Sequence, residues 1–110
     1  MTTESGLQYK IITEGTGAKP KLEDEVKVHY SGKLLDGSVF DNSYERGEPV
    51  SFSLVNVIPG WTEGLQLMHV GSRFILWIPS ELGYGERPPS QDIKPNSLLE
   101  FEIELLEIVN

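Results

Sequence analysis

Alternation of apolar and polar residues with a period of two is the feature that most constrains the fold of this chain. It runs through residues 7–11, 26–33 and 99–105. Successive side chains of a β-strand point to opposite faces, so each segment is expected to be a strand with one buried and one exposed face. Such strands are typical of antiparallel sheets, because parallel strands are usually covered on both sides. The apolar run at 72–79 predicts a further strand.

One segment has the spacing of a short helix. Trp61, Leu65 and Met68 follow one another at intervals of four and three residues. Gly71 is placed to end this helix. Gly64 inside it costs about 1 kcal/mol relative to Ala, so the helix must be held by packing against the sheet. We therefore expect an α+β fold in which a curved antiparallel sheet of about five strands wraps around one short α-helix.

The length and composition indicate one globular domain. A chain of 110 residues fits a single domain over 1–110, with residues 1–5 expected to be disordered or extended. The chain contains no cysteine, which excludes disulfides, thiolate metal sites and thiol nucleophiles. A net charge of -8 with scattered Lys and Arg argues against a nucleic-acid partner. No motif implies a cofactor.

The sequence carries no obvious membrane or export signal. No stretch approaches the roughly 20 apolar residues of a membrane span, and the N-terminus lacks the basic and apolar regions of a signal peptide. We therefore expect a cytoplasmic protein or, if these residues are a domain of a secreted precursor, a periplasmic or cell-surface one. A monomer is expected, because no exposed apolar helix is evident for pairing.

Few residues are available for covalent or metal chemistry. His29 and His69 are the only histidines, and their spacing does not suit a zinc site. There is no Gly-x-Ser-x-Gly turn of the kind that carries a nucleophilic serine. His29 alternates with valines as an ordinary strand residue would, and His69 is expected to be a solvated residue at the end of the helix.

Aromatic residues gather near the expected turns. Tyr84 lies between two glycines in the long connection 80–96, and connections of this length are usually functional or disordered. Each ring taken alone could be an ordinary core residue. Together with Asp41 and Arg46 they predict a shallow apolar pocket with a few polar groups, which is the usual chemistry of a ligand site. The rings are those of Tyr30, Phe40, Phe52, Trp61, Tyr84 and Phe101.

Several stretches of the sequence resemble those of the FKBP-type peptidyl-prolyl cis-trans isomerases and follow one another in the same order as in that family. They extend over about residues 6–109 and comprise 26–41 (VKVHYSGKLLDGSVFD), 57–61 (VIPGW), 68–71, 78–79, 84–85 and 98–108. Within the family, residues 46–52 and 57–65 resemble the bacterial macrophage-infectivity-potentiator branch. The resemblance implies a half-wrapped antiparallel sheet around one helix, in agreement with the alternation pattern.

The resemblance also implies roles for individual residues. Asp41, Tyr84 and Ile58 are the expected catalytic residues. Asp41 would face the twisting amide, Tyr84 would donate its hydroxyl to a substrate carbonyl, and Ile58 would offer its backbone N–H. A plainer role for Asp41 is to satisfy turn amides or to pair with Arg46. The residues expected to bind substrate, with Trp61 as the pocket floor, are Tyr30, Phe40, Arg46, Phe52, Val57, Trp61, Ile93 and Phe101.

The function that the resemblance implies is acceleration of X–Pro bond rotation in proline-containing polypeptides. It also implies the macrolides tacrolimus and rapamycin as ligands. Ile93-Lys94-Pro95 stands where the family usually has Ile-Pro-Pro, and Val50 where the human-type members have an aromatic residue, and both differences bear on macrolide affinity. Two alternatives remain: a non-catalytic chaperone or adaptor module that binds proline-containing or apolar segments, and a purely structural domain.

Overall fold

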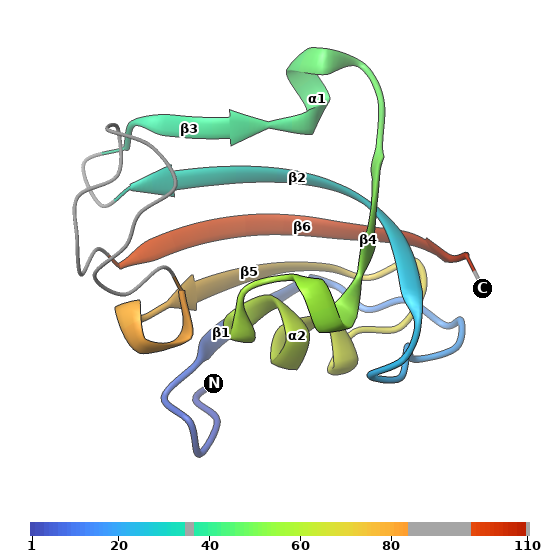
Figure 1. Cartoon of the computed structure of the whole chain (residues 1–110), viewed down its shortest axis with the longest axis horizontal. Helices are drawn as coiled ribbons and strands as arrows, with labels where there is room; N and C mark the ends of the chain where they lie inside the picture. Colours follow the sequence, from blue (N-terminus) through green and yellow to red (C-terminus); the bar gives the residue numbers. More distant parts are fainter. Residues whose placement is uncertain (35–36, 84–97, 110) are drawn as a thin grey trace.

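Within the residues that the structure describes, a six-stranded antiparallel sheet carries helix α2 (Pro59–Gln66) against its inner face (Figure 1). The computed structural model describes residues 1–34, 37–83 and 98–109. None of the helices in these ranges is long and apolar enough to cross a membrane. The elements are β1 (Gln8–Thr13), β2 (Glu25–Leu34), β3 (Val39–Asn42), α1 (Ser43–Arg46), β4 (Val50–Ser53), the 3-10 turn η1 (Leu54–Asn56), α2 (Pro59–Gln66), β5 (Arg73–Ile78), the 3-10 turn η2 (Ser80–Leu82) and β6 (Leu99–Ile108).

The sheet has the strand order β1-β5-β6-β2-β3, and β4 also pairs with β2. The two longest strands, β2 and β6, lie side by side near its centre. The outer edge of β2 is shared, since β3 pairs with residues 31–33 and β4 with residues 25–28. The curved antiparallel fold predicted from the sequence is confirmed, with one strand more than the expected five because two short strands divide this edge.

The core lies between the sheet and α2, as the alternation predicts. Every second residue of β2, β5 and β6 is buried, and the residues between them lie on the outer face. Helix α2 ends at Gln66, earlier than the spacing predicted, and the completely buried Met68 follows it. The buried apolar residues are Leu7, Val26, Val28, Tyr30, Leu54, Trp61, Leu65, Met68, Phe74, Leu76, Ile78, Leu99, Phe101, Ile103 and Leu105.

The N-terminal residues turn back along β1. Thr2 forms a β-bridge with Gln8, and the N–H of Thr3 donates to the carbonyl of Leu7 at 2.8 Å. The hydroxyl of Ser5 donates to the carboxylate of Glu63, which ties this turn to α2.

The short helix α1 was not predicted. The side-chain oxygen of Asn42 accepts hydrogen bonds from the N–H groups of Tyr44 (2.9 Å) and Glu45 (3.4 Å), and Gly47 ends the helix with a φ of 76°. An asparagine followed three residues later by glutamate and then by glycine is a signal for a capped helix. This signal is present in the sequence, but four residues are too few to show a helical period.

Two glycines bring α2 close to β5. A Cβ atom at position 64 would lie 2.6 Å from Cδ1 of Leu76, and one at position 60 would lie 2.7 Å from Cγ2 of Ile78. Leu76 and Ile78 are completely buried, so neither has empty space into which to move. Close packing against the sheet therefore explains Gly64, which helix propensity alone disfavours.

We predict that Gly64→Ala destabilises the fold, although alanine is the better helix former. Overpacking against Leu76 should cost about 1–3 kcal/mol, which exceeds the roughly 1 kcal/mol gained in propensity. Urea denaturation measures the difference in free energy of unfolding. Gly60→Ala, which faces the stiffer β-branched Ile78, should cost at least as much. A Gly64→Ala variant more stable than the wild type would contradict the close contact.

Candidate active site

Five aromatic side chains, each from a different element, meet on the inner face of the sheet, and we call them the aromatic cluster. The indole of Trp61, from α2, lies at its centre. Three rings stand nearly perpendicular to this indole with centroids 5.1 to 5.2 Å away, those of Tyr30, Phe52 and Phe101. Phe40 joins through Phe101, at 5.4 Å. Such contacts each contribute about 0.5–1.5 kcal/mol beyond the burial of area.

Strand alternation and one glycine set the positions of these rings. Tyr30 and Phe101 occupy inward positions of β2 and β6. Gly32 lies opposite Phe101 in the register of the two strands. A Cβ at position 32 would lie 2.6 Å from Cζ of Phe40 and 2.8 Å from Cε1 of Phe101. Gly32 thus makes room for two rings, a role that the sequence analysis did not foresee.

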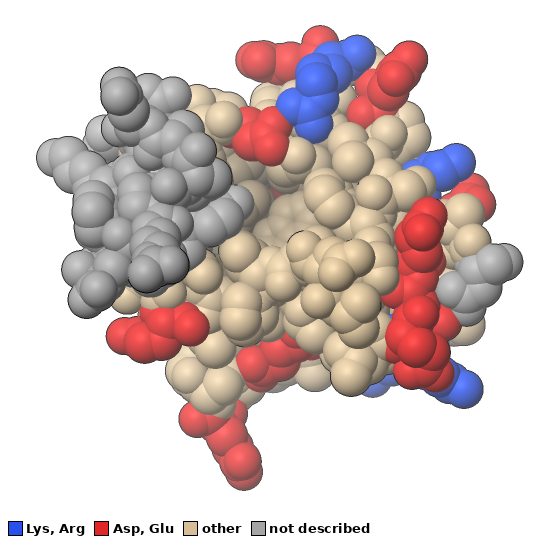
Figure 2. Space-filling model, in the orientation of Figure 1, with Lys and Arg blue, Asp and Glu red and all other residues tan. Residues whose placement is uncertain are grey.

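The aromatic cluster is buried at its base and more open at its margin. Tyr30, Trp61 and Phe101 are 6%, 4% and 3% exposed, whereas the other two rings are half-buried. The Nε1 atom of Trp61 is buried, and no residue in the described part of the chain accepts a hydrogen bond from it. On the face seen in Figure 2, uncharged residues cover the centre and the charged side chains stand around it. This arrangement suits an apolar ligand with a few polar contacts at the margin.

The two residues directly before α2 present both apolar surface and a backbone donor. Val57 and Ile58 are half-buried and pack against the core. The carbonyl of Ile58 accepts hydrogen bonds from the N–H groups of Trp61 (2.9 Å) and Thr62 (3.1 Å). The N–H of Ile58 donates to no other described residue.

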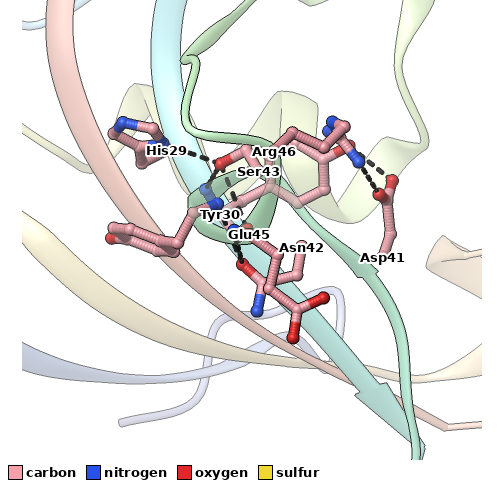
Figure 3. Close-up of polar contacts among 8 residues, drawn as sticks. His29, Tyr30, Asp41, Asn42, Ser43, Glu45 and Arg46 are labelled. Atoms are coloured by element: carbon pink, nitrogen blue, oxygen red, sulfur yellow. Dashed lines mark hydrogen bonds and ion pairs between the residues drawn. The ribbon is translucent and has the colours of Figure 1, made fainter.

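A polar network adjoins the aromatic cluster at Tyr30 (Figure 3). The hydroxyl of Tyr30 donates to Oδ2 of Asp41, and the guanidinium of Arg46 donates to Oδ1 of Asp41 at 2.5 Å. A second guanidinium nitrogen lies 3.2 Å from the Tyr30 hydroxyl. We call these three residues the carboxylate network. Three predicted site residues from β2, β3 and α1 are thereby brought together.

The carboxylate network shifts the pKa values of its members. Partial burial alone would raise the pKa of Asp41, but hydrogen bonds from Tyr30 and Arg46 and the charge of Arg46 outweigh burial, and this pKa lies below its ordinary value. The pKa of Tyr30 is raised, first by burial and then by the hydrogen bond to Asp41. At neutral pH the network is a neutral phenol held between a carboxylate and a guanidinium.

Two of the predicted site residues, Tyr84 and Ile93, lie outside the described residues. The other nine are described, and all but Val57 and Ile58 belong to the aromatic cluster or the carboxylate network. In the described part of the chain, no three His, Cys, Asp or Glu side chains are grouped as metal ligands would be.

A separate shallow groove of about 610 Å³ lies beside α2 and is lined mainly by apolar side chains. Leu54, Val57 and Pro59 contribute to it, together with Leu22 and Val55, which are 49% and 60% exposed. It shares Val57 with the predicted site, but none of the five rings lines it. The sequence analysis did not predict this groove.

We predict that Arg46→Gln raises the pKa of Asp41, because it removes the positive charge and a charge-assisted hydrogen bond. The carboxyl carbon resonance of Asp41, followed against pH by NMR, measures this change. Arg73→Gln is the matched control, since Arg73 pairs with Glu102 on the outer face of the sheet. An unchanged titration midpoint in Arg46→Gln would contradict the role of Arg46.

The same shift makes stability depend on pH in a defined direction. The pKa of Asp41 is lower in the fold than its ordinary value of 3.8, so its stabilising contribution is present above that pH and is lost as pH falls through the folded-state pKa. The side chain is 41% exposed, and solvent screening keeps the contribution small. The difference in free energy of unfolding between wild type and Arg46→Gln should therefore shrink as pH falls below 3.8.

Comparison with known proteins places this geometry in a family. Residues 16–106 match the family model of the FKBP-type peptidyl-prolyl cis-trans isomerases. The chain is 57% identical over 108 residues to the FKBP-type 22 kDa peptidyl-prolyl cis-trans isomerase of Escherichia coli. The alignment covers 98% of this chain and 52% of that protein. It is 51% identical over 104 residues to the outer membrane protein MIP of Legionella longbeachae, covering 94% of this chain and 45% of that protein.

The fold leads to the same family. It matches the crystal structure of FkpA from Escherichia coli with a TM-score of 0.93 at 50% identity, covering 98% of this chain and 50% of that one. The chain spans about half the length of the curated relatives it matches. Sequence, fold and the family model agree with the resemblance found in the sequence, and the chain belongs to the FKBP-type peptidyl-prolyl cis-trans isomerase family.

Proposed function

We propose that this domain catalyses cis-trans isomerisation of X–Pro bonds in polypeptides, with the prolyl ring held against the aromatic cluster. The observation that carries the proposal is the packing of Tyr30, Phe52 and Phe101 around the indole of Trp61, with the carboxylate network at one side. If these rings served only as core, a carboxylate and a guanidinium beside them would have no purpose. Their presence therefore supports a binding site.

The reaction requires neither a nucleophile nor a metal. Twisting an amide breaks its resonance, which sets a barrier near 20 kcal/mol, and the unassisted X–Pro bond rotates in roughly 10–100 s. No covalent bond changes, so the catalyst need only bind the twisted amide better than either planar isomer. Acceleration from roughly 100 s to about a millisecond requires a factor of roughly 10⁵, or about 7 kcal/mol.

For each residue we propose the role that the resemblance to the family implies. Trp61 is the floor on which the prolyl ring lies, and the surrounding apolar side chains exclude the water that would stabilise the planar, more polar amide. The N–H of Ile58 receives a carbonyl of the bound peptide. Asp41 faces the twisting amide and is held there by Tyr30 and Arg46. Tyr84 donates to a substrate carbonyl, and the walls are completed by Phe40, Phe52, Val57, Ile93 and Phe101.

A non-catalytic chaperone or adaptor that grips apolar segments is the second candidate function. One observation favours it, namely the shallow, mainly apolar groove beside α2, which none of the five rings lines. One domain could both catalyse isomerisation and bind apolar segments. The assay below therefore tests for turnover, which a non-catalytic module would lack.

We further propose proline-containing polypeptides as substrates, tacrolimus and rapamycin as ligands of the same pocket, and a monomeric domain. The first expectation for the location was the cytoplasm; we propose instead the alternative, a periplasmic or cell-surface protein. The support is that one relative is named an outer membrane protein.

The direct test is exchange NMR on a short Xaa-Pro-Phe peptide. Catalytic amounts of the domain should accelerate cis-trans exchange, and tacrolimus should block the acceleration. Asp41→Asn should lower kcat/KM about tenfold, equivalent to about 1.4 kcal/mol of transition-state stabilisation. Tyr84→Phe should also lower it while the fold is kept.

Glu102→Gln is the matched control for Asp41→Asn. It makes the same change from carboxylate to amide at another arginine-paired residue, on the outer face of the sheet. Its turnover should equal that of the wild type. If the wild type binds the peptide without changing the exchange rate, the adaptor function replaces the catalytic one.

A further inference from the structure

The shared edge of β2 leaves a gap in strand pairing beside the carboxylate network. On this edge β3 pairs with residues 31–33 and β4 with residues 25–28, so neither strand reaches His29 or Tyr30. The chain between β3 and β4 leaves the sheet here as α1 (Figure 1). The backbone of Tyr30 therefore has no strand partner on this side.

Ser43, the first residue of α1, fills the gap with its hydroxyl. Its Oγ accepts a hydrogen bond from the N–H of Tyr30 at 2.7 Å and lies 2.9 Å from Nδ1 of His29 (Figure 3). The carbonyl of Tyr30 is a further acceptor, at 3.3 Å. Ser43 is completely buried, so water cannot replace the hydroxyl as a partner of the Tyr30 N–H.

The hydroxyl satisfies its neighbours in either state of the histidine. If Nδ1 of His29 is unprotonated, Ser43 donates to it while accepting from Tyr30. If Nδ1 carries a proton, it donates to Ser43, whose own proton can turn to the carbonyl of Tyr30. The anchor at Tyr30 therefore does not depend on which nitrogen of His29 is protonated.

Around Ser43, helix α1 contacts both faces of the sheet edge. On the outer face, the ring of Tyr44 stacks on His29 at 4.6 Å, and its hydroxyl donates to Glu104 at 3.3 Å. On the other side, Arg46 binds Asp41 and the Tyr30 hydroxyl. Ser43 stands between Asp41 and Arg46 in the chain, so a single anchor holds both ends of their ion pair.

We propose that Ser43 is a positioning residue for the reaction: by binding the backbone of Tyr30, its hydroxyl fixes β3 and α1 so that Asp41 and Arg46 close around the Tyr30 hydroxyl. It does not touch substrate. The proposal deepens the proposed function and rests on it for its effect on turnover, whereas the effect on the carboxylate network is independent of catalysis. Sequence offers no sign of this role, because a serine at the start of a short helix is common.

Ser43→Ala is the test, and the chain contains a matched control in Ser72→Ala. Ser72 is also completely buried, and its hydroxyl also accepts backbone N–H groups, from Gly15 at 2.8 Å and His69 at 3.1 Å. It lies before β5, far along the chain from the carboxylate network. Ser43→Ala leaves the buried N–H of Tyr30 without its acceptor, and Ser72→Ala leaves the part-buried N–H groups of Gly15 and His69 without theirs, so both variants should lower the free energy of unfolding.

Only Ser43→Ala should change the site. We expect its kcat in the peptide assay to fall about tenfold with KM changed less than about twofold, the pattern of an interaction that acts in the transition state. The NMR-monitored pKa of Asp41 should rise, because the hydrogen bonds from Tyr30 and Arg46 loosen. Ser72→Ala should keep the wild-type kcat and the wild-type Asp41 midpoint.

Equal losses of kcat in the two variants, or a wild-type kcat and Asp41 pKa in Ser43→Ala, would overturn the proposal. If Ser43→Ala does not fold, Ser43→Cys keeps a similar shape with a weaker acceptor, and its kcat and Asp41 pKa are judged by the same criteria. If the wild type itself shows no turnover, the proposed function fails, and the Asp41 titration alone decides whether Ser43 positions the network.

Discussion

Pairing between β2 and β6 is the interaction on which the rest of the structure depends. The two ten-residue strands set Gly32 opposite Phe101 and turn Tyr30 and Phe101 towards α2. A slip of β6 by one residue would carry Phe101 to the outer face and would place the alternating glutamates of β6 in the core. Burial of unpaired carboxylates is costly, so the side-chain pattern excludes such a slip. The base of the aromatic cluster follows directly from the observed register.

The carboxylate network of the candidate site lies where pairing along the edge of this sheet is incomplete. A continuous strand along the outer edge of β2 would have satisfied every backbone group there, but it would have left no place for α1. Two short strands separated by α1 keep Asp41 on β3 and bring Arg46 round to it. The unpaired stretch of β2 is then satisfied by the hydroxyl of Ser43. A polar site is thus built into the edge of a sheet without leaving the Tyr30 N–H unsatisfied.

Much of this arrangement is visible in the sequence, and the remainder has identifiable physical reasons for being hidden. Period-two alternation predicted the long strands, and the order of the family's motifs predicted the fold and the family, all of which are confirmed. Helix α1 was not predicted, because four residues are too few to show a helical period. The low helix propensity of Gly64 argued against a helix at α2. The reason for this glycine is its close approach to Leu76, which depends on how the helix lies on the sheet. The roles of Tyr84 and Ile93 remain predictions.

By itself, the sequence determined which residues face inwards, that the sheet is antiparallel, and that aromatic rings and one carboxylate would be available for a site, because alternation and composition are local properties of the chain. Only the tertiary structure decided that five rings from five elements converge on Trp61, that Gly32 makes room for two of them, and that Ser43 stands at the gap in the edge of β2. These features join residues distant in sequence, and contacts of that kind are set by strand register and helix placement, which no local pattern contains.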